Sequence, residues 1–348
     1  TEAADVQEED SAMTSKPAPI GALDATKVPR FAGPGTFARI PDLHQVSDYD
    51  IAILGVPFDG GTSYRPGARF GPMAVRQAAR NLRPGFHVEL GVAPLQQLQV
   101  VDAGDVPVSP FDIAEAVSQI EAHASELLGG SDRRIVAIGG DHTIALPMLR
   151  AVTREHGPVA LVHFDAHLDT WDTYFNAPIT HGTVFRRAFE EGLLAEDKSI
   201  HVGIRGPVYD SIDLRDDASF GFRVIRAGDL DVLGVEGAVD VVRRRVGDTP
   251  VYLSIDIDVL DPAFAPGTGT PEMGGLTSRE LLAMLRRLNG LNIVAGDVVE
   301  VAPAYDHAEI TSLAAATVVF DIVTLMVNTG PVVRVPNAGE RGRQRLEG

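Results

Sequence analysis

Cysteine is absent from the sequence. This absence excludes disulfides, thiolate nucleophiles and sulfur-ligated zinc, so any bound metal must be held by His, Asp and Glu. The chain also lacks a long hydrophobic run, because no stretch approaches the roughly 20 consecutive apolar residues of a membrane-spanning helix. The first ten residues, TEAADVQEED, have neither the basic nor the apolar region of a signal peptide. We therefore expect a soluble, cytoplasmic protein with no membrane partner.

Positive charge is also scarce. Lys and Arg number 30 against 48 Asp and Glu, which gives a formal net charge of −18. This balance argues against nucleic acid or an anionic membrane surface as a partner, and favours a small cationic ligand. The chain has 348 residues, of which 45% are hydrophobic, enough for one large α/β domain.

The two ends differ in composition from the middle of the chain. Residues 1–45 are rich in Pro, Gly, Ala and acids without a sustained period, which predicts a partly irregular N-terminal extension. Met13 within it is a candidate natural start, which would make residues 1–12 an added segment. Residues 331–348 contain four Arg and predict a C-terminal tail. The catalytic domain is expected to span residues 46–330.

In the middle of the chain, short β-branched apolar runs alternate with amphipathic stretches. The runs predict strands at Tyr49–Val56, Gln97–Val101, Arg134–Ile138, Val159–Phe164, Ser199–Ile204, Arg223–Ile225, Val251–Ile255 and Ile293–Val299. The stretches predict helices at Pro110–Leu128, Ile144–His156, Val184–Glu191, Gly237–Val246, Ser278–Leu288 and Ile310–Val327. Such alternation is typical of an α/β fold with a mainly parallel sheet covered by helices on both faces.

Acids and histidines follow three of the predicted strands, at the place where open α/β sheets present their ligands. The segments are IVAIGGDHT, with Asp141 and His142; LVHFDAHLD, with Asp165, His167 and Asp169; and YLSIDIDVLDP, with Asp256, Asp258 and Asp261. Along an extended chain, groups spaced by two point the same way. A lone Asp after a strand is usually a cap or a turn residue. Several carboxylates in one crevice, however, cannot be desolvated without cations, so together they predict a metal site.

These segments, in this order and with SYRPGARFGP at 63–72 and PAFAPGTGTPE at 262–272, resemble the ureohydrolase family of arginases, agmatinases, guanidinobutyrases and proclavaminate amidinohydrolases. The resemblance covers roughly residues 48–325. It implies an arginase-like three-layer α/β/α sandwich around a mainly parallel sheet of about eight strands. It also implies an enzyme that hydrolyses a guanidino compound to urea and an amine, and a homo-oligomer, either a trimer or a hexamer.

The resemblance assigns metal ligands by position. One Mn²⁺ would be bound by His142, Asp165, Asp169 and Asp256, and the other by Asp165, His167, Asp256 and Asp258, with Asp165 and Asp256 bridging. The same oxygen and imidazole ligands also suit Ni²⁺, Co²⁺ or Zn²⁺. Asp141 is expected to orient a histidine ligand from behind, and Asp261, before Pro262, to hold a turn.

Three residues have catalytic roles in the resemblance. Glu300, in DVVEVAP, would receive the substrate guanidinium, although a lone Glu at a strand end is otherwise a solvated residue or an Arg partner. His181, in THGTVF, would exchange protons with solvent, and its alternative is an ordinary histidine of a surface loop. Asp169 would relay the proton of a water whose pKa the two metals lower.

The sequence indicates the substrate less clearly than it indicates the metal ligands. After Asp169 the chain does not have the Asn and Ser residues of arginases, and is closer to agmatinases and guanidinobutyrases. Trp171, Tyr174 and Phe175 are candidates for an apolar wall around a methylene chain, or for a lid loop packed on its own domain.

The two candidate substrates differ in the charge of the group at the end opposite the guanidinium. Asp172 and the acidic balance favour the ammonium group of agmatine, whereas Arg205 would pair with the carboxylate of 4-guanidinobutyrate. We expect an agmatinase, which forms putrescine and urea, with guanidinobutyrase or hydrolysis of another linear guanidino acid as the alternative. A non-catalytic scaffold would have lost ligands or Glu300, and none is lost.

Overall fold

The computed structural model describes residues 18–129 and 132–327 of the chain. Within these ranges eight strands form one sheet in the order β2-β1-β3-β8-β7-β4-β5-β6, and every neighbouring pair is parallel. The strands are β1 Ile51–Val56, β2 Val100–Asp105, β3 Arg134–Gly139, β4 Ala160–Phe164, β5 Ile200–Ile204, β6 Arg223–Arg226, β7 Val251–Asp256 and β8 Ile293–Val299. Each overlaps a predicted strand, so the predicted parallel sheet is confirmed.

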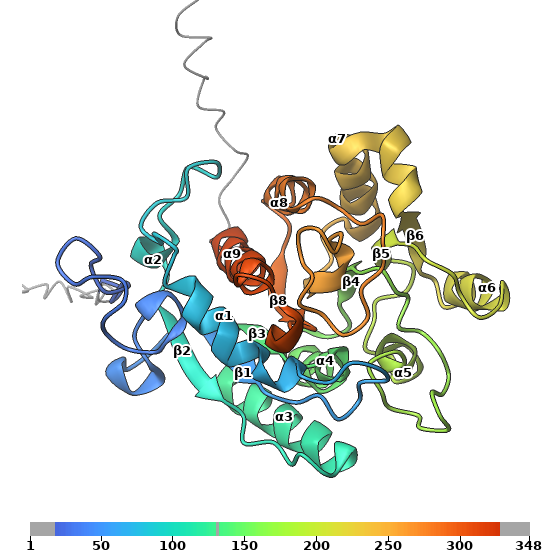
Figure 1. Ribbon diagram of the computed structural model, residues 1–348, viewed down its shortest axis with the longest axis horizontal. Coiled ribbons are helices and arrows are strands. Elements are labelled where there is room, and N and C mark those ends of the chain that lie inside the picture. Colours follow the sequence, from blue (N-terminus) through green and yellow to red (C-terminus); the bar gives the residue numbers. More distant parts are fainter. Residues whose placement is uncertain (1–17, 130–131, 328–348) are drawn as a thin grey trace, which may run out of the picture.

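Helices cover both faces of this sheet (Figure 1). They are α1 Gly71–Ala79, α2 Pro94–Gln97, α3 Ile113–Leu128, α4 Ala145–His156, α5 Val184–Glu190, α6 Ile212–Ser219, α7 Ala227–Val246, α8 Ser278–Arg287 and α9 Ile310–Leu325. Helices α3, α4 and α5 pack side by side in one layer, and α1, α9, α8 and α7 follow one another in the other. The result is the expected three-layer α/β/α sandwich, with one hydrophobic core on each side of the sheet.

The strands read as continuous apolar runs because central parallel strands are buried on both faces. Every residue of β1, β7 and β8 is buried, whereas the edge strand β6 is largely exposed. Helix α9 is apolar around its circumference, since twelve of its residues are buried between the sheet and its neighbouring helices.

Three helices were not predicted from the sequence. Helix α1 begins at a Gly-Pro pair and has no side-chain cap, α2 has four residues, and α6 is short and weakly amphipathic, so none has a clear helical signal. Helix α7 begins ten residues before the predicted start because Gly234, with φ 63°, interrupts its pattern.

The described part of the predicted extension, residues 18–45, packs along the edge strand β2. The amide of Phe37 donates to Oδ2 of Asp102 at 2.6 Å, and Arg39 donates to carbonyls of Leu23 and Val28. Met13, residues 1–12 and the predicted tail at 331–348 lie outside the described residues. None of the helices within residues 18–129 and 132–327 combines the length and the hydropathy of a bilayer-spanning segment.

Candidate metal centre and active site

Four neighbouring strands, β3, β8, β7 and β4, end at the same edge of the sheet. The polar residues selected from the sequence follow these ends, because the carboxyl ends of parallel strands all face one side. His142, Asp165, Asp256, Asp258 and Glu300 lie there, and each is at most 3% exposed. Segments more than 150 positions apart therefore meet in one buried cluster.

Three carboxylates surround one nitrogen of His142. Its Nδ1 lies 2.9 Å from Oδ2 of Asp169, 3.3 Å from Oδ2 of Asp165 and 3.5 Å from Oδ2 of Asp256. Despite these short separations, Nδ1 makes no hydrogen bond of acceptable geometry within the described ranges. The four groups converge on a point between them, which is the arrangement of a cation site.

A second group of ligands lies beside the first. Nδ1 of His167 is 3.1 Å from Oδ2 of Asp258 and 3.3 Å from Oδ1 of Asp165. Asp165 thus turns one oxygen to each group. His142, Asp165 and Asp169 form, with His163, one group whose ligand atoms lie close enough to hold a metal ion, and Asp165, His167 and Asp258 form another. The structure therefore brings all six predicted metal ligands together, with Asp165 shared between the two clusters.

The hydrogen bonds behind His142 fix how its ring is presented. Ser254 Oγ donates to Oδ1 of Asp297 at 2.6 Å, and Tyr252 donates to the other oxygen of that carboxylate. Because the Ser254 hydrogen is used, Nε2 of His142 must donate to Oγ, at 2.8 Å. In the neutral ring, Nδ1 then presents a lone pair to the three carboxylates, as a metal ligand does.

Burial and crowding raise the proton affinity of this cluster. Burial, together with neighbouring carboxylates, raises the pKa of Asp258 to about 6 and that of Asp256 well above its ordinary value. Burial and Asp165 also raise the pKa of Asp169. Burial lowers the pKa of His142, but the contacts with Asp165, Asp169 and Asp256 outweigh it and raise that pKa well above 6.5. The cluster must hold either protons or metal cations, because buried carboxylates this close cannot all be charged alone.

Two residues of the site have strained backbones. Asp169 has φ 56° and Glu300 has φ 64°, in the left-handed region that Asp tolerates better than Glu. The amide of Glu300 donates to the carbonyl of Gly140 at 2.8 Å, which holds the turn against β3. Such strain costs on the order of 1–3 kcal/mol per residue and persists where it places a functional side chain.

The two oxygens of Glu300 have different surroundings. Oε1 lies 2.9 Å from the amide of His142, which donates to it, and 3.1 Å from Nδ1 of His181. Oε2 is buried and has no hydrogen-bond partner in the part of the chain that the structure describes. A Cβ added at Gly269 would lie 3.5 Å from Oε2, an ordinary contact distance, and 3.0 Å from the carbonyl oxygen of Arg65, which is a tight one. Glu300 therefore has one occupied acceptor and one available for a ligand.

His181 is held between Glu300 and a serine. Its Nε2 lies 2.7 Å from Oγ of Ser63, and its side chain is 12% exposed. Burial lowers the pKa of His181, but the hydrogen bond to Glu300 more than offsets this and raises the pKa to about 9. The ring thus lies in the wall of the site instead of in a solvated loop.

A cavity of about 440 Å³ opens onto the cluster. Its walls include the predicted residues His167, Asp169, Trp171, Tyr174, His181 and Asp256, joined by Ser63, Tyr64, Arg65, Tyr209 and Glu272. The ring centroid of Trp171 is 5.6 Å from that of Tyr174 and 5.5 Å from that of Tyr209. Phe175, in contrast, is 83% exposed and lies outside the cavity lining.

Two residues predicted to bind substrate lie elsewhere. Asp172 is exposed and accepts a hydrogen bond from Arg187 at 2.7 Å. Arg205 donates to main-chain carbonyls, including those of Asp258 at 2.6 Å and Glu272 at 2.8 Å. Neither lines the cavity. The structure therefore does not support substrate contacts for Asp172 or Arg205: the first is paired at the surface, and the second braces the loops around the site.

Of the two acids predicted to support the site, Asp141 has contacts other than the expected ones, whereas Asp261 holds a turn. Oδ2 of Asp141 accepts from the amide of Gly61 at 2.7 Å and Oδ1 from that of Thr143 at 3.0 Å, so Asp141 holds loops together and bonds no histidine ligand. Burial and the nearby Glu300 raise the pKa of Asp141 to about 7. Asp261 accepts from three amides of the loop that it begins, as expected for a turn.

Several residues that support the ligands from behind were not predicted from the sequence. His163 precedes Asp165 by two positions and Ser254 precedes Asp256 by two, so each points to the same side as the ligand that follows it. Asp297 is an acid inside the apolar strand IVAGDVV. A polar residue within a fully buried strand needs a partner, and that signal was available in the sequence.

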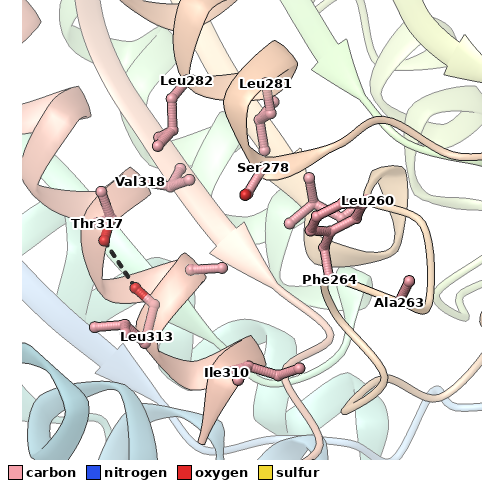
Figure 2. A pocket seen from close by; sticks show the side chains of 11 residues that line it. Leu260, Ala263, Phe264, Ser278, Leu281, Leu282, Ile310, Leu313, Thr317 and Val318 are labelled. Carbon is pink, nitrogen blue, oxygen red and sulfur yellow. Dashed lines mark hydrogen bonds between the residues drawn. The ribbon is translucent and has the colours of Figure 1, made fainter.

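A second cavity, of about 390 Å³, is apolar and distinct from the site. It lies between α8, α9 and the loop after Leu260, where Leu281, Leu282, Ile310 and Leu313 line it (Figure 2). The hydroxyl of Thr317 in its wall donates to the carbonyl of Leu313 at 2.9 Å. This cavity has no acid, base or imidazole among its lining residues and cannot perform the same chemistry.

Comparisons with known proteins agree with this geometry. The sequence profile described as Arginase family matches residues 49–324. A putative agmatinase of Schizosaccharomyces pombe is 47% identical over 330 residues, covering 86% of this chain and 81% of that protein. A guanidinopropionase of Pseudomonas aeruginosa is 45% identical and covers 88% of this chain and 96% of its own.

The fold has solved counterparts. The structure of proclavaminate amidinohydrolase from Streptomyces clavuligerus superposes with a TM-score of 0.82 and 44% sequence identity, covering 87% of this chain and all of that one. These relatives are named for different substrates, although their sequence identities to this chain are nearly equal.

Proposed function

Because the chain belongs to the arginase family, whose members include hydrolases of amidino C–N bonds, we propose that it hydrolyses agmatine to urea and putrescine. The observation that carries the proposal is the buried, unpartnered Oε2 of Glu300 beside a cluster of metal-ligating carboxylates. A guanidinium needs such an acceptor, and its hydrolysis needs an activated water.

The donor set fits two divalent cations. His142, Asp165, Asp169 and Asp256 would hold one, and Asp165, His167, Asp256 and Asp258 the other. Oxygen donors outnumber imidazoles, which suits Mn²⁺ better than softer metals, with Ni²⁺, Co²⁺ and Zn²⁺ as alternatives. When bound, such a pair supplies a nucleophilic water at neutral pH.

The remaining steps belong to side chains of this protein. Glu300 accepts guanidinium N–H groups at Oε2 and holds the central carbon over the carboxylate cluster. Asp169, whose pKa burial and Asp165 raise, accepts the proton released when water attacks the carbon. His181, whose Nε2 faces Ser63 in the cavity wall, passes a proton to the departing amine.

The cavity walls favour agmatine through its ammonium group. Trp171, Tyr174 and Tyr209 present aromatic rings, which attract cations and repel carboxylates. Glu272 also lines the cavity, where it adds a carboxylate. Together these groups would bind a methylene chain that ends in a positive charge.

One observation favours a guanidino acid instead. Arg65 lines the same cavity, with its guanidinium carbon 5.6 Å from the ring centroid of Tyr64 and 5.3 Å from that of Tyr305. It has no ion pair within the described ranges and would pair with the carboxylate of 4-guanidinobutyrate. Guanidinobutyrase is therefore the second candidate. Assembly as a trimer or hexamer remains an expectation.

Urea release tests the proposal. Agmatine, 4-guanidinobutyrate, 3-guanidinopropionate, arginine and guanidine are compared with Mn²⁺, Ni²⁺, Co²⁺ and Zn²⁺. A kcat/KM preference for agmatine of about a hundredfold, which equals about 3 kcal/mol, is expected.

Two variants separate the candidate substrates. Glu272→Gln should lower kcat/KM for agmatine and spare 4-guanidinobutyrate, whereas Arg65→Gln should do the opposite. Hundredfold or greater preference for a guanidino acid would replace agmatine as substrate, and no urea from any compound with full metal loading would overturn the proposal.

A further inference from the structure

A line of buried polar side chains runs from the shared ligand Asp165 away from the cavity. Nε2 of His163 lies 2.7 Å from Oδ2 of Asp165, and Nδ1 of His163 lies 2.6 Å from Nδ1 of His201. Nε2 of His201 lies 3.2 Å from Oδ1 of Asp217, a close contact without hydrogen-bond geometry in the described part of the chain. All four residues are 0% exposed. Three titratable side chains behind the ligand are thus sealed from solvent, and the mechanism above uses none of them.

A second contact connects Asp217, at the far end of this line, back to the chain next to a predicted metal ligand. The hydroxyl of Thr170 donates to the same oxygen, Oδ1 of Asp217, at 3.0 Å. Thr170 directly follows Asp169 in the chain. Asp217, on helix α6, therefore contacts both the ring of His201 and the residue next to Asp169.

The fold places these groups in register. His163 on β4 and His201 on β5 are Cα partners of neighbouring parallel strands, so both rings leave the sheet on the same face. A carboxylate that binds a metal is ionised and can only accept, so Nε2–H of His163 donates to Oδ2 of Asp165. Nδ1 of His163 then faces Nδ1 of His201.

Aromatic rings enclose the line. The ring centroid of Phe185 is 4.5 Å from that of His163, and that of Phe222 is 4.5 Å from that of His201. In such surroundings a hydrogen bond is strong and a polar group left without one is costly. The orientation of one ring therefore constrains the next.

We propose that His163, His201 and Asp217 form a positioning line that fixes the carboxylate of Asp165 for metal binding and couples it, through Thr170, to the position of Asp169. The proposal rests on the metal centre of the proposed function. None of these residues touches the substrate cavity, so their effect reaches the chemistry only through the ligands. Partners that orient metal ligands commonly contribute about ten- to hundredfold in metal affinity.

The test measures Mn²⁺ affinity of the metal-free full chain by titration calorimetry. His201→Phe keeps an aromatic ring but removes both contacts, and should weaken Mn²⁺ binding at least about tenfold. His87→Phe is the matched control. His87 is buried, with Nε2 2.9 Å from Oδ1 of Asp321, in the core on the other face of the sheet. It should lower the melting temperature and leave Mn²⁺ affinity unchanged.

A second pair of variants covers the case in which His201→Phe does not fold. Asp217→Ala removes the carboxylate that contacts His201 and accepts from Thr170, without altering either imidazole, and should weaken Mn²⁺ binding in the same way. Asp217→Asn retains an acceptor oxygen and should restore affinity to within about threefold of the unsubstituted chain. Rescue by Asn but not by Ala distinguishes positioning from the loss of a buried charge.

Three results would overturn the inference. They are Mn²⁺ affinities of His201→Phe and Asp217→Ala within threefold of the original, an equal loss in His87→Phe, and no Mn²⁺ binding by the unsubstituted chain. Urea release is measured separately. If Mn²⁺ binding responds as expected and no guanidino compound yields urea, the proposed function fails and the positioning line stands.

Discussion

Glu300 offers the sharpest test of the catalytic arrangement, through the substitution Glu300→Gln. The change keeps the size of the side chain and removes its charge. Oε1 lies 2.9 Å from the amide of His142 and 3.1 Å from Nδ1 of His181. The single oxygen of Gln should take that place, because both neighbours donate. Its NH₂ group then occupies the position of Oε2, where the guanidinium is to be accepted.

The expected loss follows from these contacts. A hydrogen bond to a charged group contributes about 1.5–3 kcal/mol, and a donor left facing another donor adds roughly 1–3 kcal/mol. The sum of about 2.5–6 kcal/mol corresponds to a decrease in kcat/KM of about seventyfold to about twenty-five-thousandfold. Metal content should not change, because Glu300 is not among the groups that converge on the cation positions.

The assay combines urea release with metal analysis of the same samples. Asp172→Asn is the matched control, since this carboxylate lies near the site in sequence but is paired with Arg187 outside the cavity. It should retain kcat/KM within about threefold, as surface substitutions generally do. If Glu300→Gln kept kcat/KM within tenfold of the original, or lost its metal, the assigned role of Glu300 would be wrong.

Further predictions concern the metal centre and its entrance. Ser254→Ala removes the hydroxyl that bonds Nε2 of His142 and should weaken Mn²⁺ binding about ten- to hundredfold, measured by calorimetry. Gly269→Ala puts a methyl group 3.0 Å from the carbonyl oxygen of Arg65 and 3.5 Å from Oε2 of Glu300, and should raise KM in the urea assay while Mn²⁺ affinity stays unchanged. The pKa of Asp258, raised to about 6 mainly by burial, means that the metal-free fold binds its proton more tightly than the unfolded chain does. From this group the metal-free protein should lose stability as pH rises from about 4 to about 6, and the rise in melting temperature caused by Mn²⁺ should grow over the same window. An equal Mn²⁺-induced rise at pH 5 and pH 8 would contradict that reasoning.

The sheet could be predicted from the sequence because its interior strands are buried on both faces. A strand such as β7, with every residue buried, must be apolar along its whole length, and that run is visible without any alignment. The ligands could be predicted for a related reason. They follow strand ends, and in a parallel sheet all those ends face the same side.

The substrate contacts could not be predicted, because they depend on which partners distant side chains find. Arg205 donates to carbonyls of residues more than 50 positions away, so its guanidinium is occupied before any ligand arrives. Arg65 and Glu272 are ordinary loop residues in the sequence, and only the fold places both in one cavity. The spacing of residues in the sequence predicts to which side of a strand they point. It does not predict which long side chains pair across loops.

Charge repulsion and backbone strain at the site destabilise the fold, and they determine how a bound metal should change its stability. Crowded carboxylates raise one another's pKa, and Asp169 and Glu300 have strained backbones, whereas the two hydrophobic cores around the sheet supply the stability that holds them. A cation that binds only the folded cluster relieves the repulsion, and at a hundred times its Kd it would add about 2.7 kcal/mol to the free energy of unfolding. Because the unfolded chain cannot bring these segments together, metal affinity and the stability gained on adding metal should fall together when any ligand of the cluster is replaced.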